Sequence, residues 1–255
     1  MKIIKFNFIR GMKSGSIKER LGDPDAVIKY FTDIILSDPT VAKAYLARGN
    51  AKSDLKDLQG AIWDYTKTIE LDANSDLAYL NRGHEKTLLG NIQGAMSDFT
   101  HAIAINPDNQ FAFCNRGNIK IGLRDYQGAI ADFNDAVAIE PGFVDPYVAM
   151  GLVKFMTGDA LGALDELNKA SAIDDALVEV HSTMGIINYE LKDYQAALVE
   201  FTKAIDLDPL FAEGYLGRGL TKLALGNGQA GYLDVHKAAE LGSKDAFGML
   251  NDNLN

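Results

Sequence analysis

The chain of 255 residues contains one cysteine and four histidines, and both low counts restrict its possible chemistry. Cys114 cannot form an intramolecular disulfide by itself and is compatible with a reducing compartment. The histidines lie at unrelated positions, and no two of them have the i, i+4 spacing typical of metal ligands on one helix. They are His84, His101, His181 and His236. We therefore expect no metal site.

The sequence also lacks long apolar runs and an excess of basic residues. No apolar segment approaches the roughly 18 residues needed to cross a bilayer. Lysine and arginine total 25 against 35 acidic residues, which gives a formal charge of −10 and excludes the basic footprint of a nucleic-acid-binding domain. The first residues, MKIIKFNFIRG, are followed by no small-residue cleavage site. We expect a cytoplasmic protein without membrane insertion, and a longer precursor stays open.

Motifs for catalysis are missing as well. Gly226, Gly228 and Gly231 spell the G-x-G-x-x-G pattern, but they lie in an expected turn between helices with no strand before them to build a phosphate site. No nucleophile, base and orienting group can be assembled from the remaining residues. We therefore expect no catalytic site, no cofactor and no enzyme activity.

A regular repeat is the dominant feature that is present. One glycine recurs with a period of 34 residues, at Gly15, Gly49, Gly83, Gly117, Gly151, Gly185 and Gly219. This period is typical of helix-turn-helix units that stack on their neighbours. We predict a lead-in at 1–7, seven units at 8–41, 42–75, 76–109, 110–143, 144–177, 178–211 and 212–245, and a C-terminal cap at 246–255 in which Phe247, Met249 and Leu250 cover the last unit.

Each unit carries the apolar spacing of two helices. Small residues such as Ala61 and Ala95 are followed four positions later by bulky ones such as Tyr65 and Phe99, which places them on one helical face. In the unit 42–75 we predict helices over 43–54 and 58–70. The turn between the helices holds a residue suited to the left-handed conformation in alternate units, Gly22, Gly90, Gly158 and Gly226, whereas Lys56, Arg124 and Lys192 fill the same slot elsewhere.

These columns resemble the tetratricopeptide repeat family. The family's first-helix aromatic matches Tyr45, Tyr79, Phe113, Tyr147 and Tyr215, its glycine matches in every unit, and most second-helix positions agree. The resemblance implies an all-α fold, a right-handed superhelical solenoid of seven helix-turn-helix repeats with a short C-terminal capping helix. It also implies an inner groove that binds peptides or partner helices.

Two first-helix positions depart from the family pattern. Arginine stands before the glycine at Arg48, Arg82, Arg116 and Arg218, and lysine three residues after it. The units with arginine carry aspartate before the second-helix aromatic, at Asp64, Asp98, Asp132 and Asp234, while the units with Met150 and Met184 carry Glu166 and Glu200. We hypothesise Arg–Asp pairs between the two helices of a unit. The alternative is a set of independent solvated charges.

The resemblance places the groove lining on the first helices. The candidate residues in the N-terminal half are Asn50, Asn81, His84, Phe111, Asn115, Asn118 and Ile121, and those in the C-terminal half are Leu152, Phe155, Met156, Ile186, Tyr189, Glu179 and Glu213. Asparagines can bind peptide backbone, while aromatic and methionine side chains are typical anchors of a binding site. In the alternative interpretation the apolar side chains pack against neighbouring helices.

We predict an adaptor or scaffold that binds a peptide or amphipathic helix in this groove. Because Glu179 and Glu213 make the rim acidic, the ligand would combine apolar anchors with basic residues. Leu46, Phe111 and Asn115 stand where the family's chaperone-tail clamp has basic residues, which disfavours that ligand. Two alternatives remain, a self-associating structural scaffold and a non-catalytic subunit of an enzyme complex.

Overall fold

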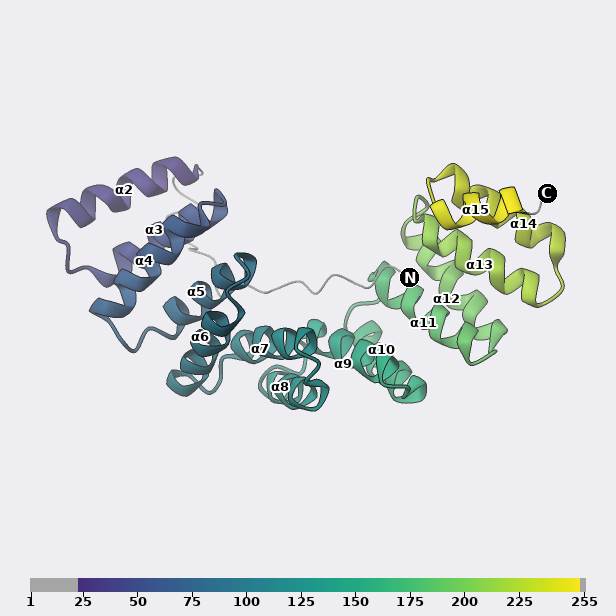
Figure 1. The fold of residues 1–255 in the computed structure, drawn as a ribbon, viewed down its shortest axis with the longest axis horizontal. Coiled ribbons are helices and arrows are strands. Elements are labelled where there is room, and N and C mark those ends of the chain that lie inside the picture. Colours follow the sequence, from purple (N-terminus) through teal and green to yellow (C-terminus); the bar gives the residue numbers. More distant parts are fainter. Residues whose placement is uncertain (1–22, 253–255) are drawn as a thin grey trace. The chain divides into compact units, whose positions relative to one another are not determined.

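The protein is described here by a computed structural model of residues 23–252, in which we find fourteen α-helices and no strand (Figure 1). The predicted all-α class is therefore confirmed. The helices are α2 (Pro24–Ser37), α3 (Ala42–Asp54), α4 (Leu58–Leu71), α5 (Asp76–Leu88), α6 (Ile92–Ile105), α7 (Gln110–Gly122), α8 (Tyr126–Ile139), α9 (Val144–Met156), α10 (Ala160–Ile173), α11 (Val178–Glu190), α12 (Tyr194–Leu207), α13 (Ala212–Ala224), α14 (Gly228–Glu240) and α15 (Lys244–Asp252).

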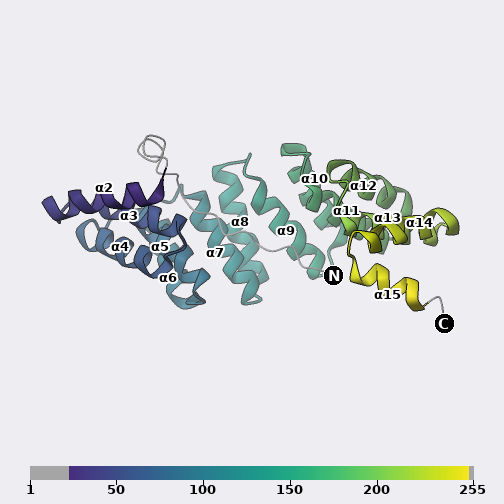
Figure 2. The same cartoon turned by 90° about the horizontal axis from the view of Figure 1, so that it is seen from above.

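The described residues divide into two bodies, one of residues 23–146 and one of residues 147–252, and the division falls inside α9. In the N-terminal body each first helix packs against the second helix of its own pair, as α3 does with α4, and each second helix packs against the next first helix, as α4 does with α5. The C-terminal body repeats this order from α11 to α15, as Figure 2 also shows. The first helix expected within 8–41, together with Gly15 and Gly22, lies outside the described residues.

The recurring glycine lies in close contact with the bulky second-helix residue of its own pair, which is aromatic in four pairs, Leu167 in one and Val235 in another. A Cβ atom on Gly49 would lie 2.8 Å from Cε1 of Tyr65, and one on Gly117 would lie 2.7 Å from Cε1 of Phe133. Tyr65 and Phe133 are fully buried. Glycine is thus required at this column because any side chain would separate the two helices.

The turns inside the pairs combine two local devices. Gly90, Gly158 and Gly226 have positive φ, and so do Lys56, Arg124 and Lys192 at φ 62–63°, as the sequence predicts. The residue that follows caps the second helix, and in α4 Oδ1 of Asp57 accepts a hydrogen bond from the Gly60 amide at 3.0 Å. The same cap recurs at Asn91, Asp125, Asp159 and Asp193. Both devices fix where the second helix starts.

The C-terminal helix α15 covers α14 with fewer residues than expected. Ala246 is fully buried in the cluster of Val235 and Ala238, and Leu250 packs against it. Phe247 is exposed, so the prediction that it covers the last pair is wrong. Residues 246 and 250 lie one helical turn apart on the face of α15 that contacts α14. Position 247 lies on a different face and therefore does not take part in this contact.

The left-handed turns generate a stability prediction. Replacing Arg124 with glycine should raise the free energy of unfolding by about 0.5–1 kcal/mol, because only glycine adopts φ 62° without a steric penalty. Ala131→Gly, an exposed position inside α8, should lower the free energy of unfolding by about 1 kcal/mol. Urea unfolding followed by circular dichroism measures both. Equal destabilisation by the two variants would contradict the prediction.

Candidate functional site

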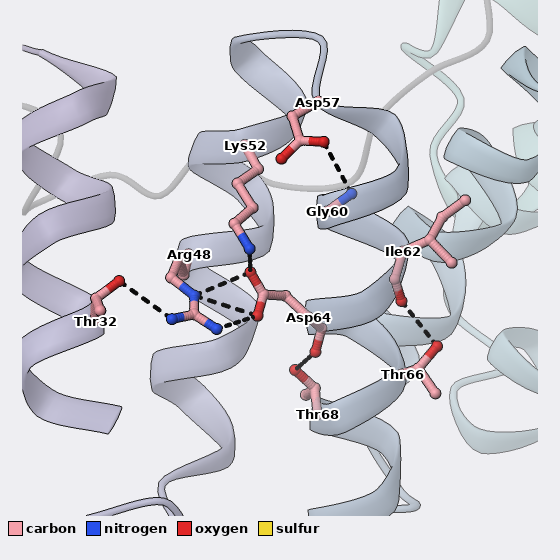
Figure 3. A network of polar contacts seen from close by, with 9 residues as sticks. All are labelled: Thr32, Arg48, Lys52, Asp57, Gly60, Ile62, Asp64, Thr66 and Thr68. Carbon is pink, nitrogen blue, oxygen red and sulfur yellow. Dashed lines mark hydrogen bonds and ion pairs between the residues drawn. The ribbon is translucent and has the colours of Figure 1, made fainter. Parts of the chain in front are cut away.

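The first helices are fixed by an ion-pair network that begins at Arg48 on α3 (Figure 3). Its Nη2 and Nε atoms donate to the two carboxylate oxygens of Asp64 on α4 at 2.7 and 3.1 Å, and Lys52 Nζ lies 2.8 Å from Oδ2. Its Nη1 atom donates to Thr32 Oγ1 on α2 at 3.1 Å. Asp64 is fully buried. One guanidinium therefore joins three helices.

The network recurs in the other pairs that carry arginine. Arg82 pairs with Asp98 and donates to Thr66, and Arg116 pairs with Asp132 and donates to Thr100. In the C-terminal body Arg218 pairs with Asp234 through two hydrogen bonds. Each guanidinium also lies 5.4–5.6 Å from the ring of the first-helix aromatic three residues before it. The predicted Arg–Asp pairs are confirmed, and the threonine contacts are an addition from the structure.

The two pairs without arginine use a different base for the same acid column. Glu166 on α10 accepts from Lys154 Nζ at 2.6 Å, and Glu200 on α12 contacts Nδ1 of the buried His181 at 2.7 Å. His181 Nε2 lies 3.1 Å from the carbonyl oxygen of Asp175. In these two pairs methionine replaces arginine, and glutamate, which is longer than aspartate, reaches Lys154 or His181 instead. His181 therefore has a structural role between α11 and α12.

The ion pair between Arg218 on α13 and Asp234 on α14 shifts the pKa values of both residues. Burial alone would raise the pKa of Asp234, but hydrogen bonds from Arg218 and Lys222 outweigh burial and hold that pKa below its usual value. The hydrogen bond to Asp234 correspondingly raises the pKa of Arg218. The folded C-terminal body therefore favours the ionised carboxylate.

In the N-terminal body the candidate groove residues form a mostly polar row on α3, α5 and α7. Asn81 Nδ2 and the Tyr65 hydroxyl both donate to Oδ1 of Asn50 at 2.9 Å. Helix α3 contacts α5, and α5 contacts α7. Asn50, Asn81, Asn115, Asn118 and Ile121 are buried, while His84 and Phe111 are partly exposed. The burial of these residues is a finding of the structure, because the sequence pattern gives no measure of it.

One member of this row was not among the predicted residues. Glu85 on α5 is 0% exposed, and its Oε1 atom accepts a hydrogen bond from Ser53 Oγ on α3 at 2.5 Å. The Oδ1 atoms of Asn81 and Asn118 and the Oε2 atom of Glu85 are buried, and none has a hydrogen-bond partner among residues 23–252. The signal that could have identified Glu85 is a charged residue in a column that is otherwise apolar or small.

In the C-terminal body the candidate residues are more accessible. Met156 on α9 is 49% exposed, and Phe155 beside it is partly exposed. Ile186 and Tyr189 on α11 and Leu152 on α9 are partly exposed, and Glu179 and Glu213 are exposed. The Tyr189 ring lies 5.5 Å from that of Tyr194. Helix α11 contacts α13, which carries Glu213. Accessible apolar and acidic side chains thus occur together on these first helices.

The remaining candidates for chemical function, Cys114 and the glycine motif at 226–231, have structural roles in helix packing. Burial and then the nearby Asp145 charge raise the pKa of the Cys114 thiol far above its usual value, which makes it a poor nucleophile. Gly231 is buried in α14, where a Cβ atom would lie 2.7 Å from Leu223, and the helix α13 precedes this motif. Residues 23–252 contain no cluster of three side chains that could hold a metal ion. None of their helices combines the length and apolarity needed to cross a membrane.

Comparison with known proteins finds similarity to one family. A family model described as the tetratricopeptide repeat matches residues 77–109, 112–143 and 178–209. No curated protein sequence matched the chain.

Solved structures give a consistent result. MamA is 26% identical with a TM-score of 0.59, over 64% of this chain and 96% of MamA. YrrB, described as a TPR protein with an unusual peptide-binding site, is 18% identical with a TM-score of 0.63, over 74% of this chain and 97% of YrrB. A tetratricopeptide repeat protein from Parabacteroides merdae ATCC 43184 is 20% identical with a TM-score of 0.65, over 94% and 95% of the two chains.

The ion-pair network predicts the effect of one neutralisation. Asp132→Asn should lower the free energy of unfolding by about 1–3 kcal/mol, because it leaves Arg116 and Lys120 partly buried without a counter-charge. Asp135→Asn, an exposed position on the same helix, should change it by less than about 0.5 kcal/mol. Chemical unfolding measures the difference. An unchanged midpoint for Asp132→Asn would mean that the pairs contribute nothing to stability.

The lowered pKa of Asp234 predicts a pH dependence with a defined sign. A carboxyl group with a depressed folded-state pKa stabilises the protein above its unfolded value of about 3.9, and this contribution is lost as pH falls through the folded value. The stability difference between the wild type and Asp234→Asn should therefore be constant above about pH 5 and shrink at lower pH. Thermal unfolding between pH 3 and 7 checks it, and a difference that grows on acidification would contradict the assignment.

Proposed function

Because the chain is a tetratricopeptide repeat protein, we propose that it is a non-catalytic, cytoplasmic adaptor that binds a peptide or an amphipathic helix of a partner protein on its first helices. The observation that carries the proposal is the accessibility of Phe155, Met156 and Tyr189 on α9 and α11. Large apolar side chains that stay accessible on a folded surface are the usual anchors of a binding site.

The charges favour a ligand with basic residues. Glu179 is exposed in the first turn of α11 and Glu213 in the first turn of α13, and the chain has a formal charge of −10. A ligand with apolar anchors and lysine or arginine would match both features, and charge complementarity would raise its association rate. The description of YrrB as peptide-binding agrees with this class of ligand, although the likeness in fold alone names no partner for this chain.

Exposed apolar side chains on the second helices favour a second candidate, a scaffold that self-associates. Leu161 on α10 is 72% exposed and Val199 on α12 is 64% exposed. Light scattering across a range of protein concentrations distinguishes the two candidates, because self-association raises the mass with concentration and an adaptor stays monomeric.

A matched pair of double variants tests the adaptor. Phe155→Glu with Tyr189→Lys should keep the helical circular dichroism signal and lose the partner captured by the wild type from native lysate. Leu161→Glu with Val199→Lys makes the same chemical changes on the second helices and should retain it. Mass spectrometry of the captured proteins reads out both. Loss of the partner only in the second variant would move the site to the second helices.

A further inference from the structure

Glu85 occupies a slot that the other described pairs fill with uncharged residues. It lies two residues after the recurring glycine, a column that reads Ala51, Glu85, Ile119, Val153, Ile187 and Thr221. Every described member of this column is buried, and Glu85 is buried completely. An acidic side chain at a buried slot built for alanine or isoleucine opposes folding unless something compensates its charge.

The compensation within the described residues is incomplete. Ser53 Oγ donates to Oε1, and His84 Nδ1 lies 3.3 Å from the same oxygen. The Oε2 atom has no hydrogen-bond partner. Two nearby lysines, Lys52 on α3 and Lys86 on α5, are engaged elsewhere, since Lys52 pairs with Asp64 and Lys86 with Asp98. One oxygen of the carboxylate is therefore left for a donor that these residues do not supply.

A second unpaired acceptor lies one helical turn away on the same face of α5. Asn81 donates through Nδ2 to Asn50 Oδ1, and this oxygen also accepts from the Tyr65 hydroxyl. Because the amide of Asn81 must present its nitrogen to Asn50, its oxygen is left without a partner. Positions 81 and 85 are neighbours at i, i+4. Two acceptors without donors thus stand on adjacent turns of one helix.

The two unpaired oxygens, Glu85 Oε2 and Asn81 Oδ1, require a partner that donates hydrogen bonds. Buried oxygens without a donor are rare in native proteins, and each calls for a ligand, an ion or a water as partner. A carboxylate and an amide oxygen together match a cation with several N–H donors. We infer that Glu85 and Asn81 bind an arginine or lysine side chain of the protein ligand.

The inference rests on the proposed function of peptide binding by the first helices, and it concerns α5 of the N-terminal body alone. His84 is the route to the carboxylate. It contacts Glu85, it is one of the predicted groove residues, and 13% of its side chain remains exposed. The incoming cation replaces the His84 contact at Oε1 and pairs with Oε2.

The first experiment selects peptides without knowing the partner. A random 16-residue peptide library displayed on phage is panned against the full chain, Glu85→Gln and Glu190→Gln. Glu190 is exposed on α11, so its variant carries the same change in net charge. Peptides selected by the wild type and by Glu190→Gln should share an arginine or lysine at one fixed position, and those selected by Glu85→Gln should lack it.

A selected peptide then allows a pairwise measurement. Replacing its arginine with citrulline, or its lysine with norleucine, should weaken binding to the wild type by at least about 30-fold, because one member of a buried charge pair is lost. The same replacement should have little effect on Glu85→Gln, since the interaction is already absent there. Isothermal titration calorimetry measures all four combinations. Equal losses with both proteins would overturn the inference.

A stability measurement separates a binding role from a structural one. Glu85→Ile, which introduces the residue found at Ile119 and Ile187, should raise the melting temperature and abolish the basic preference. A structural role for Glu85 predicts a lower melting temperature with unchanged peptide selection, which would overturn the inference. Failure of the wild type to select any peptide contradicts the proposed function itself, whereas selected peptides without a fixed basic residue contradict only the role of Glu85.

Discussion

The repeated Arg–Asp ion pair is the interaction on which the arrangement of the helices depends. Arg48 donates to Asp64 in its own pair and to Thr32 in the preceding pair, so that one planar guanidinium sets both the spacing within a pair and the spacing between pairs. Arginine suits this task because its donors form a rigid fork, whereas a lysine ammonium is a single point charge. The stacking of Arg48 against the Tyr45 ring restricts the fork further. A buried network of this kind stabilises only if all its members are present, since a lone buried charge is strongly unfavourable.

Fixing the helices in this way leaves a few first-helix positions free to differ between pairs. The same backbone position carries Asn50 in α3, His84 in α5 and Asn118 in α7, but Leu152 in α9 and Ile186 in α11. In the N-terminal body these residues are polar, with Asn50 and Asn118 buried and His84 partly exposed. In the C-terminal body they are apolar and partly exposed. The two bodies therefore offer different binding chemistry on the same helical framework, directional hydrogen bonds in one and contact with apolar area in the other.

The sequence predicted the features that follow from a local or repeated pattern, such as helix boundaries. It did not predict contacts between residues of different pairs that belong to no repeated pattern. Helices α3 and α4 were predicted to within one residue at each end, because Lys56 and Asp57 at the turn mark their boundaries. The Arg–Asp pairs were predictable because arginine and aspartate covary among the copies. Ser53 and Glu85 are 32 residues apart in different pairs, and neither belongs to a repeated pattern. The exposure of Phe247 was likewise missed, since the composition of α15 does not reveal which face meets α14.

Comparing the repeats of this chain with one another distinguishes residues that folding requires from residues that have another role. A column that is bulky and buried in every described pair, such as the one with Tyr65, Phe99 and Leu167, satisfies a constraint that every pair shares. Glu85 satisfies no such constraint, because the other described pairs bury an uncharged residue at its position. Replacing it with one of those residues would remove an unpaired charge and leave the helix contacts in place. The neighbouring repeats show that folding does not require a glutamate at position 85, and its buried charge opposes folding. A ligand that supplies the missing hydrogen-bond donor best explains why Glu85 is present.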